Sequence, residues 1–193
     1  MRMLAGLAVV TISALLAAAC HFPETTGASH DETGALAARV RVLEDREAIR
    51  ELMFTYGKLL DAKDLVGYSE LFARDGVWEG GIGSARGPEE IYQMLDTVFN
   101  RAGANEFGPS YHIMSDIMIS VDGDTATSWS HWTWIVEGKD GTPTGQRSGH
   151  YEDRLVREDG KWKFLHRLTV TELPTPEMDA EAQIFRKDHR EGN

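Results

Sequence analysis

The stretch YHIMSDIMISVDGDTATSWSHWTWIV, residues 111–136, decides the fold of this chain. Its centre, Asp122-Gly123-Asp124, is a turn signal between two runs rich in β-branched and aromatic residues, the pattern of a β-hairpin. Two further turns of the same kind, Asp140-Gly141 and Asp159-Gly160, separate the runs that follow. The pattern therefore predicts a meander of antiparallel strands over residues 111–121, 125–136, 147–156 and 161–172.

Ahead of these strands, apolar residues recur at helical spacing. Steps of three and four from Leu36 to Leu60 predict a long amphipathic helix with one buried face. Shorter helices are expected over residues 65–72 and 88–100, the second opening with a proline and two glutamates. Between them, Val77-Trp78 indicates a first strand, and a glycine-rich loop is expected at Gly80, Gly81, Gly83 and Gly87. Helices followed by a meander make an α+β domain, which we expect to be a curved sheet wrapped around the helices.

Length and charge limit the classes of function. A chain of 193 residues with 41% hydrophobic content suits one domain with a sizeable core. The formal net charge of -11 and the absence of a Lys/Arg cluster argue against nucleic acid as a partner, because binding to phosphate backbones requires a basic surface.

The N-terminus carries a targeting pattern. Arg2 is the only charge before the apolar run of residues 4–19, which is too short for a membrane span and fits the core of a signal peptide. Small residues before Cys20 resemble the lipobox of bacterial lipoproteins. That resemblance implies removal of residues 1–19, a lipid anchor on Cys20 and a location in the cell envelope, facing the periplasm. The alternative is an ordinary signal peptide cleaved near Ala19.

Two polar segments flank the expected domain. Residues 20–34 have almost nothing to bury and are expected to form a flexible tether. Residues 173–193 form a C-terminal tail with a weak helical pattern over residues 180–185. This tail covers the mouth of the domain, contacts a partner subunit or stays disordered.

Asp61 and His112 are candidates for a catalytic pair. Asp61 lies one step beyond Leu60, at the edge of the buried helix face, and His112 lies near the start of a predicted strand. If the fold brings them together, the carboxylate can fix the tautomer of a neutral imidazole and make it a base that needs no cofactor. The structural alternatives are a helix-end carboxylate and a core histidine.

The order and spacing of five short motifs are more specific than any one of them: REAIREL at 46–52, FARDGVW at 72–78, GPEEI at 87–91, VDGDTA at 121–126 and GKWKF at 160–164. Together with Tyr56, Asp61 and His112 they resemble a SnoaL-like domain of the nuclear-transport-factor-2-like superfamily, over residues 35–172. The resemblance implies a cone-shaped barrel, in which a bent antiparallel sheet surrounds three N-terminal helices and leaves one end open. The resemblance is compatible with a homodimer or a homotrimer.

Within that superfamily the chain is similar to the scytalone and bile-acid dehydratases and to hexachlorocyclohexane dehydrochlorinase. That similarity implies a catalytic dyad of Asp61 and His112, a catalytic Arg167 and a role for Tyr56. One departure is Asp116, four residues past His112, where the family often has Asn. A carboxylate on the same strand face would favour the protonated imidazole or compete with Asp61 for it.

The chemistry expected of such a site can be stated from its residue types. His112 would abstract a carbon-bound proton and Asp61 would orient it. Arg167 would stabilise the developing negative charge with its planar fork, and Tyr56 would donate a hydrogen bond to the leaving group. Elimination, isomerisation and aldol cyclisation all remain open. Trp78, Asp116, Trp132 and His150 are predicted to line a pocket for a hydrophobic small molecule.

The sequence contains no motif for binding a metal ion or a cofactor. The histidines lack short ligand spacing, and phosphate-loop and dinucleotide fingerprints are missing. We therefore expect no cofactor and no metal. The leading hypothesis is a lyase or isomerase of the cell envelope, and the alternative is a non-catalytic binding or assembly domain. An Asp61 carboxylate within about 3 Å of a His112 ring nitrogen, beside a deep pocket, would favour the enzyme.

Overall fold

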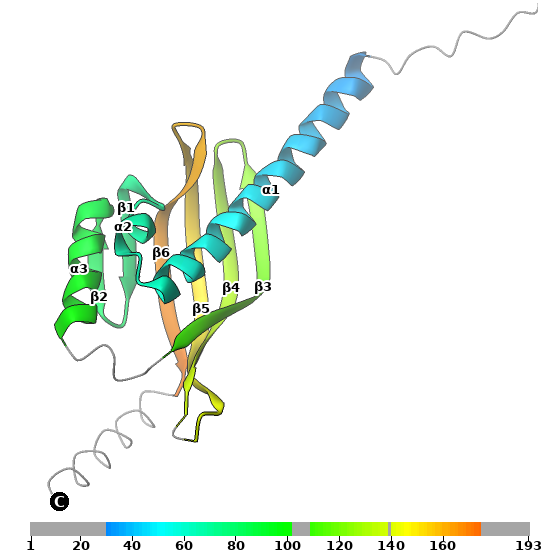
Figure 1. The fold of residues 1–193 in the computed structure, drawn as a ribbon. Helices are drawn as coiled ribbons and strands as arrows, with labels where there is room; N and C mark the ends of the chain where they lie inside the picture. Colours follow the sequence, from blue (N-terminus) through cyan, green and yellow to red (C-terminus); the bar gives the residue numbers. More distant parts are fainter. Residues whose placement is uncertain (1–29, 102–108, 139, 175–193) are drawn as a thin grey trace, which may run out of the picture.

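The structure is a computed structural model that describes residues 30–101, 109–138 and 140–174 (Figure 1). A long helix comes first, and a sheet packed with two shorter helices follows it. The elements are α1 (His30–Ala62), α2 (Leu65–Ser69), β1 (Phe72–Gly80), β2 (Gly83–Arg86), α3 (Gly87–Arg101), β3 (Ser110–Asp122), β4 (Thr125–Glu137), β5 (Pro143–Glu158) and β6 (Lys161–Leu173).

The six strands form one curved, unclosed sheet in the order β2-β1-β6-β5-β4-β3 (Figure 1). The meander from β3 to β6 is antiparallel throughout, so this prediction is confirmed. The expectation that the whole sheet is antiparallel is wrong at one place, because β1 pairs with β6 in parallel. A parallel pair requires a long connection between its two strands. Here β2, α3 and the strands β3–β5 provide that connection between β1 and β6.

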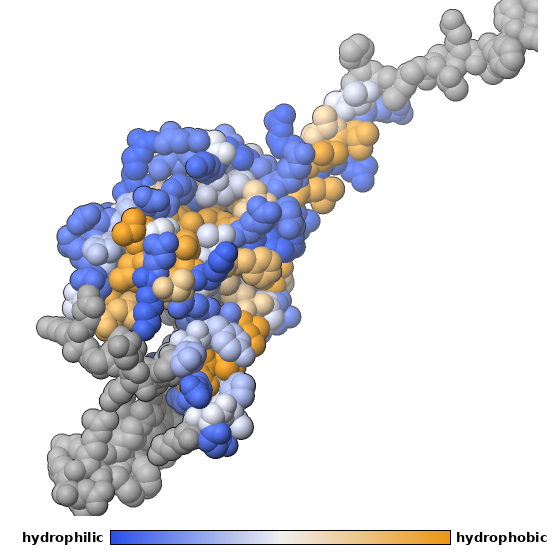
Figure 2. Space-filling view, in the orientation of Figure 1, coloured by the Kyte–Doolittle hydropathy of each residue, from blue (hydrophilic) through white to orange (hydrophobic). Residues whose placement is uncertain are grey.

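The core lies between the inner face of the sheet and the C-terminal half of α1. Ile49, Met53 and Tyr56 on that helix are buried, together with Phe72 of β1 and Phe164 of β6. This confirms the α+β class and the buried helix face. The N-terminal part of α1 projects away from the sheet, and Figure 2 shows apolar atoms exposed along it.

Several boundaries differ from the sequence-based expectations. Helix α1 begins at His30, inside the range 20–34 expected to be a flexible tether. The strand expected at residues 77–78 begins at Phe72, and α2 is correspondingly short. The expected glycine loop contains β2, which pairs with β1 in a tight hairpin. In such short apolar runs, the two-residue period of a strand cannot be distinguished from the period of a helix.

The predictions for the two termini lie outside the described residues. These are the signal peptide of residues 1–19, the lipidation of Cys20 and the helix over 180–185. Within the described ranges, none of the helices is long and apolar enough to span a bilayer.

Candidate functional site

The last turn of α1 presents Asp61 to the sheet. Lys63 adopts a left-handed conformation with φ of 58°, and the backbone N–H groups of Lys63 and Asp64 donate to Leu60 (3.1 Å) and Leu59 (2.9 Å). This is a Schellman motif, which ends the helix sharply after Ala62. A carboxylate near the negative end of a helix dipole does not favour the helix. The position of Asp61 is better explained by what its side chain contacts.

Asp61 holds His112 at two points. Its Oδ1 lies 2.6 Å from His112 Nδ1, and its Oδ2 accepts the backbone N–H of His112 at 2.9 Å. The backbone bond is available because β3 is an edge strand of the sheet. An ionised carboxylate can only accept, so Nδ1 is assigned as the donor and Nε2 carries the lone pair. The contact predicted from the sequence is present, and its geometry suits a base.

His112 lies at the wall of a cavity of about 530 Å³ inside the curve of the sheet. The side chains of the pair are only 17% and 20% exposed, and Trp134 stacks on the imidazole at 6.3 Å between centroids. The lining is mostly aromatic and aliphatic: Tyr56, Leu60, Tyr68, Trp78, Ile82, Leu95, Val98, Phe99, Trp132, Trp134 and Tyr151, with Asp61, Lys63, Ser110, His112 and Thr169. Such an enclosure fits a hydrophobic ligand of a few rings.

Three tyrosines gather on the wall of this cavity. Tyr56 accepts hydrogen bonds from the Tyr68 hydroxyl at 2.6 Å and from the Trp78 indole N–H at 3.1 Å. Tyr151 packs edge-on against Tyr56, and burial raises the pKa values of Tyr68 and Tyr151 well above the ordinary value. Tyr68 and Tyr151 are therefore neutral donors at physiological pH. Tyr56, Trp78 and Trp132 all line this cavity.

Arg167 does not lie where the sequence placed it. It is fully buried, and its Nε and Nη2 donate to the two oxygens of Asp153 at 2.7 and 2.8 Å. Arg167 is not among the residues that line the cavity, since it lies behind the rings of Tyr56 and Tyr151. The fork that was expected to meet the substrate is occupied by Asp153.

Asp116 and His150 were expected in the pocket, and both expectations are wrong. Asp116 has a positive φ of 52° at an irregularity in β3, and its carboxylate bonds to His131 at 2.9 Å. The bulge moves Asp116 off the face of His112. His150 bonds to Glu172 at 2.9 Å on the outer face, because its neighbour Tyr151 takes the inward position.

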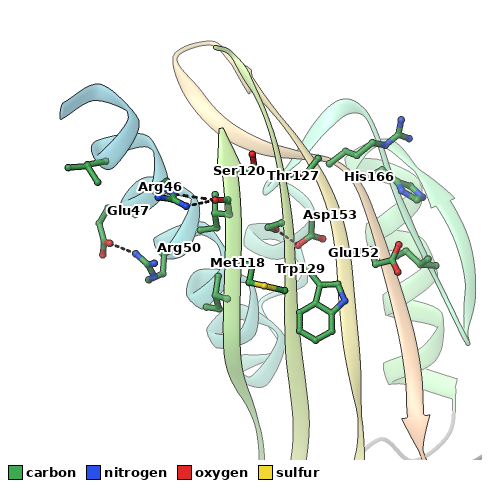
Figure 3. Close-up of a pocket in the computed structure, with 16 residues that line it drawn as sticks. Arg46, Glu47, Arg50, Met118, Ser120, Thr127, Trp129, Glu152, Asp153 and His166 are labelled. Carbon is green, nitrogen blue, oxygen red and sulfur yellow. Dashed lines mark hydrogen bonds and ion pairs between the residues drawn. The ribbon is translucent and has the colours of Figure 1, made fainter. Parts of the chain in front are cut away.

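The outer face carries a second, larger concavity of about 1060 Å³ (Figure 3). Strand residues on its floor include Met118, Trp129 and Glu152, and Arg46 and Arg50 of α1 lie along the β3 side. It is broadly open, and the Asp61–His112 pair lies outside it. We therefore base the chemistry on the smaller inner cavity. Among the described residues, no three His, Cys, Asp or Glu side chains cluster to hold a metal ion.

Several residues that line the cavity were not singled out from the sequence, among them Tyr68, Tyr151 and Thr169. The signal for Tyr151 was present in the chain. Residues 150, 152 and 154 are polar, whereas Tyr151 and Leu155 lie at alternate positions, which is the pattern of a strand with one buried face; Asp153 is the polar exception on that face. Tyr68 required the packing of α2 against α1.

Comparisons with known proteins agree with this fold. A model of the SnoaL-like domain family matches residues 41–168. A nuclear-transport-factor-2-like protein with a cystatin-like fold from Novosphingobium aromaticivorans is 30% identical, with a TM-score of 0.66, and the match covers 78% of this chain and 97% of that one. A putative scytalone dehydratase from the same organism is 27% identical, with a TM-score of 0.57 and coverage of 68% and 86%.

A more distant structure from Catenulispora acidiphila, in complex with S-DNPA, is 20% identical with a TM-score of 0.58, covering 67% of this chain and 94% of that one. At this identity the likeness concerns the fold alone. Curated proteins offer no match to the chain.

Proposed function

Since this chain belongs to the SnoaL-like domain family, we propose that it is a cofactor-independent enzyme of the lyase or isomerase kind. Its substrate is a hydrophobic small molecule from which His112 removes a carbon-bound proton. The observation that carries the proposal is the two-point hold of Asp61 on His112 at the wall of a cavity lined largely by aromatic side chains.

The proton moves to Nε2 of His112. Because Asp61 accepts from Nδ1, the ring has its lone pair on Nε2, and the carboxylate stabilises the imidazolium that forms. The electron pair of the broken C–H bond forms a new double bond, and a leaving group departs with its own electron pair. In an isomerisation nothing departs, and His112 returns the proton to another carbon.

Tyr56 and Tyr151 are suited to the negative charge that develops. Both line the same cavity as His112, and Trp132 lies between the two regions, 6.5 Å from the His112 ring and 5.9 Å from the Tyr151 ring. The oxygen of Tyr56 already accepts two hydrogen bonds, so its own proton is directed to another acceptor. We assign Tyr56 as a donor to the departing or enolic oxygen.

The alternative is a binding or assembly domain without catalysis. It predicts a filled cone, or a His112 ring turned away and bonded to backbone. The open cavity and the Asp61 contact favour the enzyme. Similarity to a putative scytalone dehydratase favours the same class of reaction.

A generic carbon acid can test the proposal without the natural substrate. Nitrobenzisoxazole loses its ring C–H proton to a base, the C–H electron pair forms a nitrile, and the N–O bond breaks, so that the opened ring carries the negative charge as a phenolate. We expect saturable turnover by the wild type and none by His112→Ala, while His131→Ala serves as the matched control from the outer face. Equal turnover by wild type and His112→Ala would refute His112 as the base.

We also propose that the enzyme acts in the cell envelope, anchored through Cys20. The support is the apolar run of residues 4–19 followed by small residues and a cysteine. Labelled palmitate supplied to cells is expected to enter the wild type and not Cys20→Ser. Labelling of both proteins, or of neither, would contradict the anchor.

A further inference from the structure

A buried ion pair lies directly behind the tyrosines of the pocket. Arg167 on β6 and Asp153 on β5 are directly paired on neighbouring strands, and they are 0% and 4% exposed. Ser128 on β4 donates to Asp153 Oδ2 at 2.8 Å. Burial disfavours the charged guanidinium, but the adjacent Asp153 carboxylate outweighs this and raises the pKa of Arg167. The pair is therefore charged and fixed in place.

The guanidinium contacts three aromatic rings. Its central carbon lies 4.0 Å from the ring centroid of Tyr56, 4.2 Å from that of Tyr151 and 4.0 Å from that of Phe164. These distances are those of close cation–π contacts. Two of the three residues, Tyr56 and Tyr151, also line the cavity. The third guanidinium nitrogen, Nη1, has no hydrogen-bond partner among the described residues.

A buried pair of this kind is costly for a protein that only needs stability. Desolvation offsets much of the attraction between the two charges, and apolar residues of similar size commonly replace such pairs without loss of stability. Here the positive charge is placed within contact of two phenols at the reaction cavity. A cation beside a phenol makes its hydroxyl a stronger hydrogen-bond donor.

We propose that Arg167 is a positioning residue for the reaction: held by Asp153, it orients Tyr56 and Tyr151 and strengthens their hydroxyls as donors to an oxygen anion. The pocket end at these tyrosines therefore takes the oxygen on which negative charge develops. This inference rests on the proposed function for its reaction, although its binding part can be measured separately.

The consequence for Arg167 differs from direct catalysis. Arg167 touches no substrate, because its fork is filled by Asp153 and it does not line the cavity. Its effect passes through the tyrosine hydroxyls. Removing it leaves the base His112 intact and weakens the stabilisation of the anion.

The test replaces the pair by apolar residues of similar size, Asp153→Leu with Arg167→Met, so that no charge is left unpaired. With nitrobenzisoxazole, we expect kcat to fall about tenfold while KM and the pH dependence of turnover stay unchanged. A wild-type kcat in the folded double variant would overturn the proposal.

Binding of para-nitrophenol separates this inference from the proposed function. Phenol and phenolate absorb differently, so the ionisation of the bound probe is read directly, in a His112→Ala background where the base cannot contribute. Loss of the ion pair is expected to shift the bound probe about tenfold toward the phenol. Arg167→Lys keeps the charge and is expected to keep most of the phenolate.

Three results would overturn the proposal: no binding of the phenolate by the parent, an equal phenolate fraction after removal of the pair, or a loss in Arg167→Lys as large as in the double variant. Should the double variant not fold, Tyr151→Phe in the same background decides instead, because it removes one of the two hydroxyls through which Arg167 acts, and an unchanged phenolate fraction would overturn the proposal. Absence of nitrobenzisoxazole turnover with normal phenolate binding would refute the proposed base and leave the role of Arg167 standing.

Discussion

The described part of the sheet places four histidines against carboxylates, three on its outer face and one on its inner face. On the outer face the contacts are His131 with Asp116 at 2.9 Å, His150 with Glu172 at 2.9 Å and His166 with Glu79 at 3.2 Å. On the inner face His112 meets Asp61 at 2.6 Å. The chemical groups are nearly the same, so their surroundings make the difference.

Two surroundings distinguish the inner pair. Asp61 is 20% exposed and also holds the backbone of His112, whereas Asp116 is 68% exposed and makes only side-chain contacts in β3 and β4. An exposed pair is weakened by water and salt, and contributes little. The inner pair faces a cavity with aromatic walls and tyrosine donors. A histidine and a carboxylate become a candidate site through enclosure and fixed orientation.

Removing the inner base is expected to have the largest effect. In His112→Ala, turnover of nitrobenzisoxazole should fall by about 100-fold to 10,000-fold, the range typical of a lost general base. Far-ultraviolet circular dichroism and thermal melting should show that the fold is kept. If His131→Ala loses as much activity as His112→Ala, the contrast between the faces is broken.

Asp61→Asn should come next. An amide group that accepts from the His112 backbone cannot also accept from Nδ1, so the ring is no longer held in the useful tautomer. We expect kcat to fall about 100-fold with KM little changed, as for a base with a misoriented ring. Asp116→Asn is the matched control and should retain full activity. A fully active Asp61→Asn enzyme would contradict the dyad, because His112 would then either act as a base without Asp61 or not be the base.

Tyr56→Phe should have an intermediate effect. It removes the acceptor shared by Tyr68 and Trp78, so two buried donors lose their partner at a cost of about 1–3 kcal/mol each. The free energy of unfolding in urea should fall, and kcat should fall about tenfold. Tyr68→Phe removes only one donor, and it should be less destabilising and nearly fully active. Equal loss of kcat in both variants would argue against a special role for Tyr56.

The sequence predicted the meander and the inner pair for identifiable reasons. The Asp-Gly turns at 122–123 and 159–160 mark strand ends locally, and Asp61 lies at the end of a long periodic helix. The pairing of Asp61 with His112 was implied by the resemblance to SnoaL-like domains, whereas the edge position of β3, which leaves the His112 backbone N–H available to Asp61, is seen only in the structure.

The errors have a common cause, which is that irregularities of a strand are not visible in its sequence. The bulge in β3 turns Asp116 outward. In β5 the register places Tyr151, and not His150, on the inner face, and extra residues in β6 set which of its side chains point inward. A shift of one residue exchanges the two faces of a strand. The Asp153 partner of Arg167 depends on the same register and could not be anticipated.

The outer pairs should give the smallest effect. A hydrogen bond from His131 lowers the pKa of the Asp116 carboxyl, so its contribution to stability is present above the ordinary Asp value and is lost as the pH falls through the lowered one. Because the group is exposed, urea unfolding of Asp116→Asn at neutral pH should match the wild type within error. A clear loss of stability would give the outer face a structural role that its exposure does not suggest.

The Asp61–His112 dyad is tested most directly by the protonation of the His112 ring, measured by nitrogen-resolved NMR at a pH where the ring is neutral. We expect a proton on Nδ1, toward Asp61, and an unprotonated Nε2, with this preference lost in Asp61→Asn. A proton on Nε2 in the wild type would contradict it, because His112 would then have no lone pair to offer a substrate in the cavity.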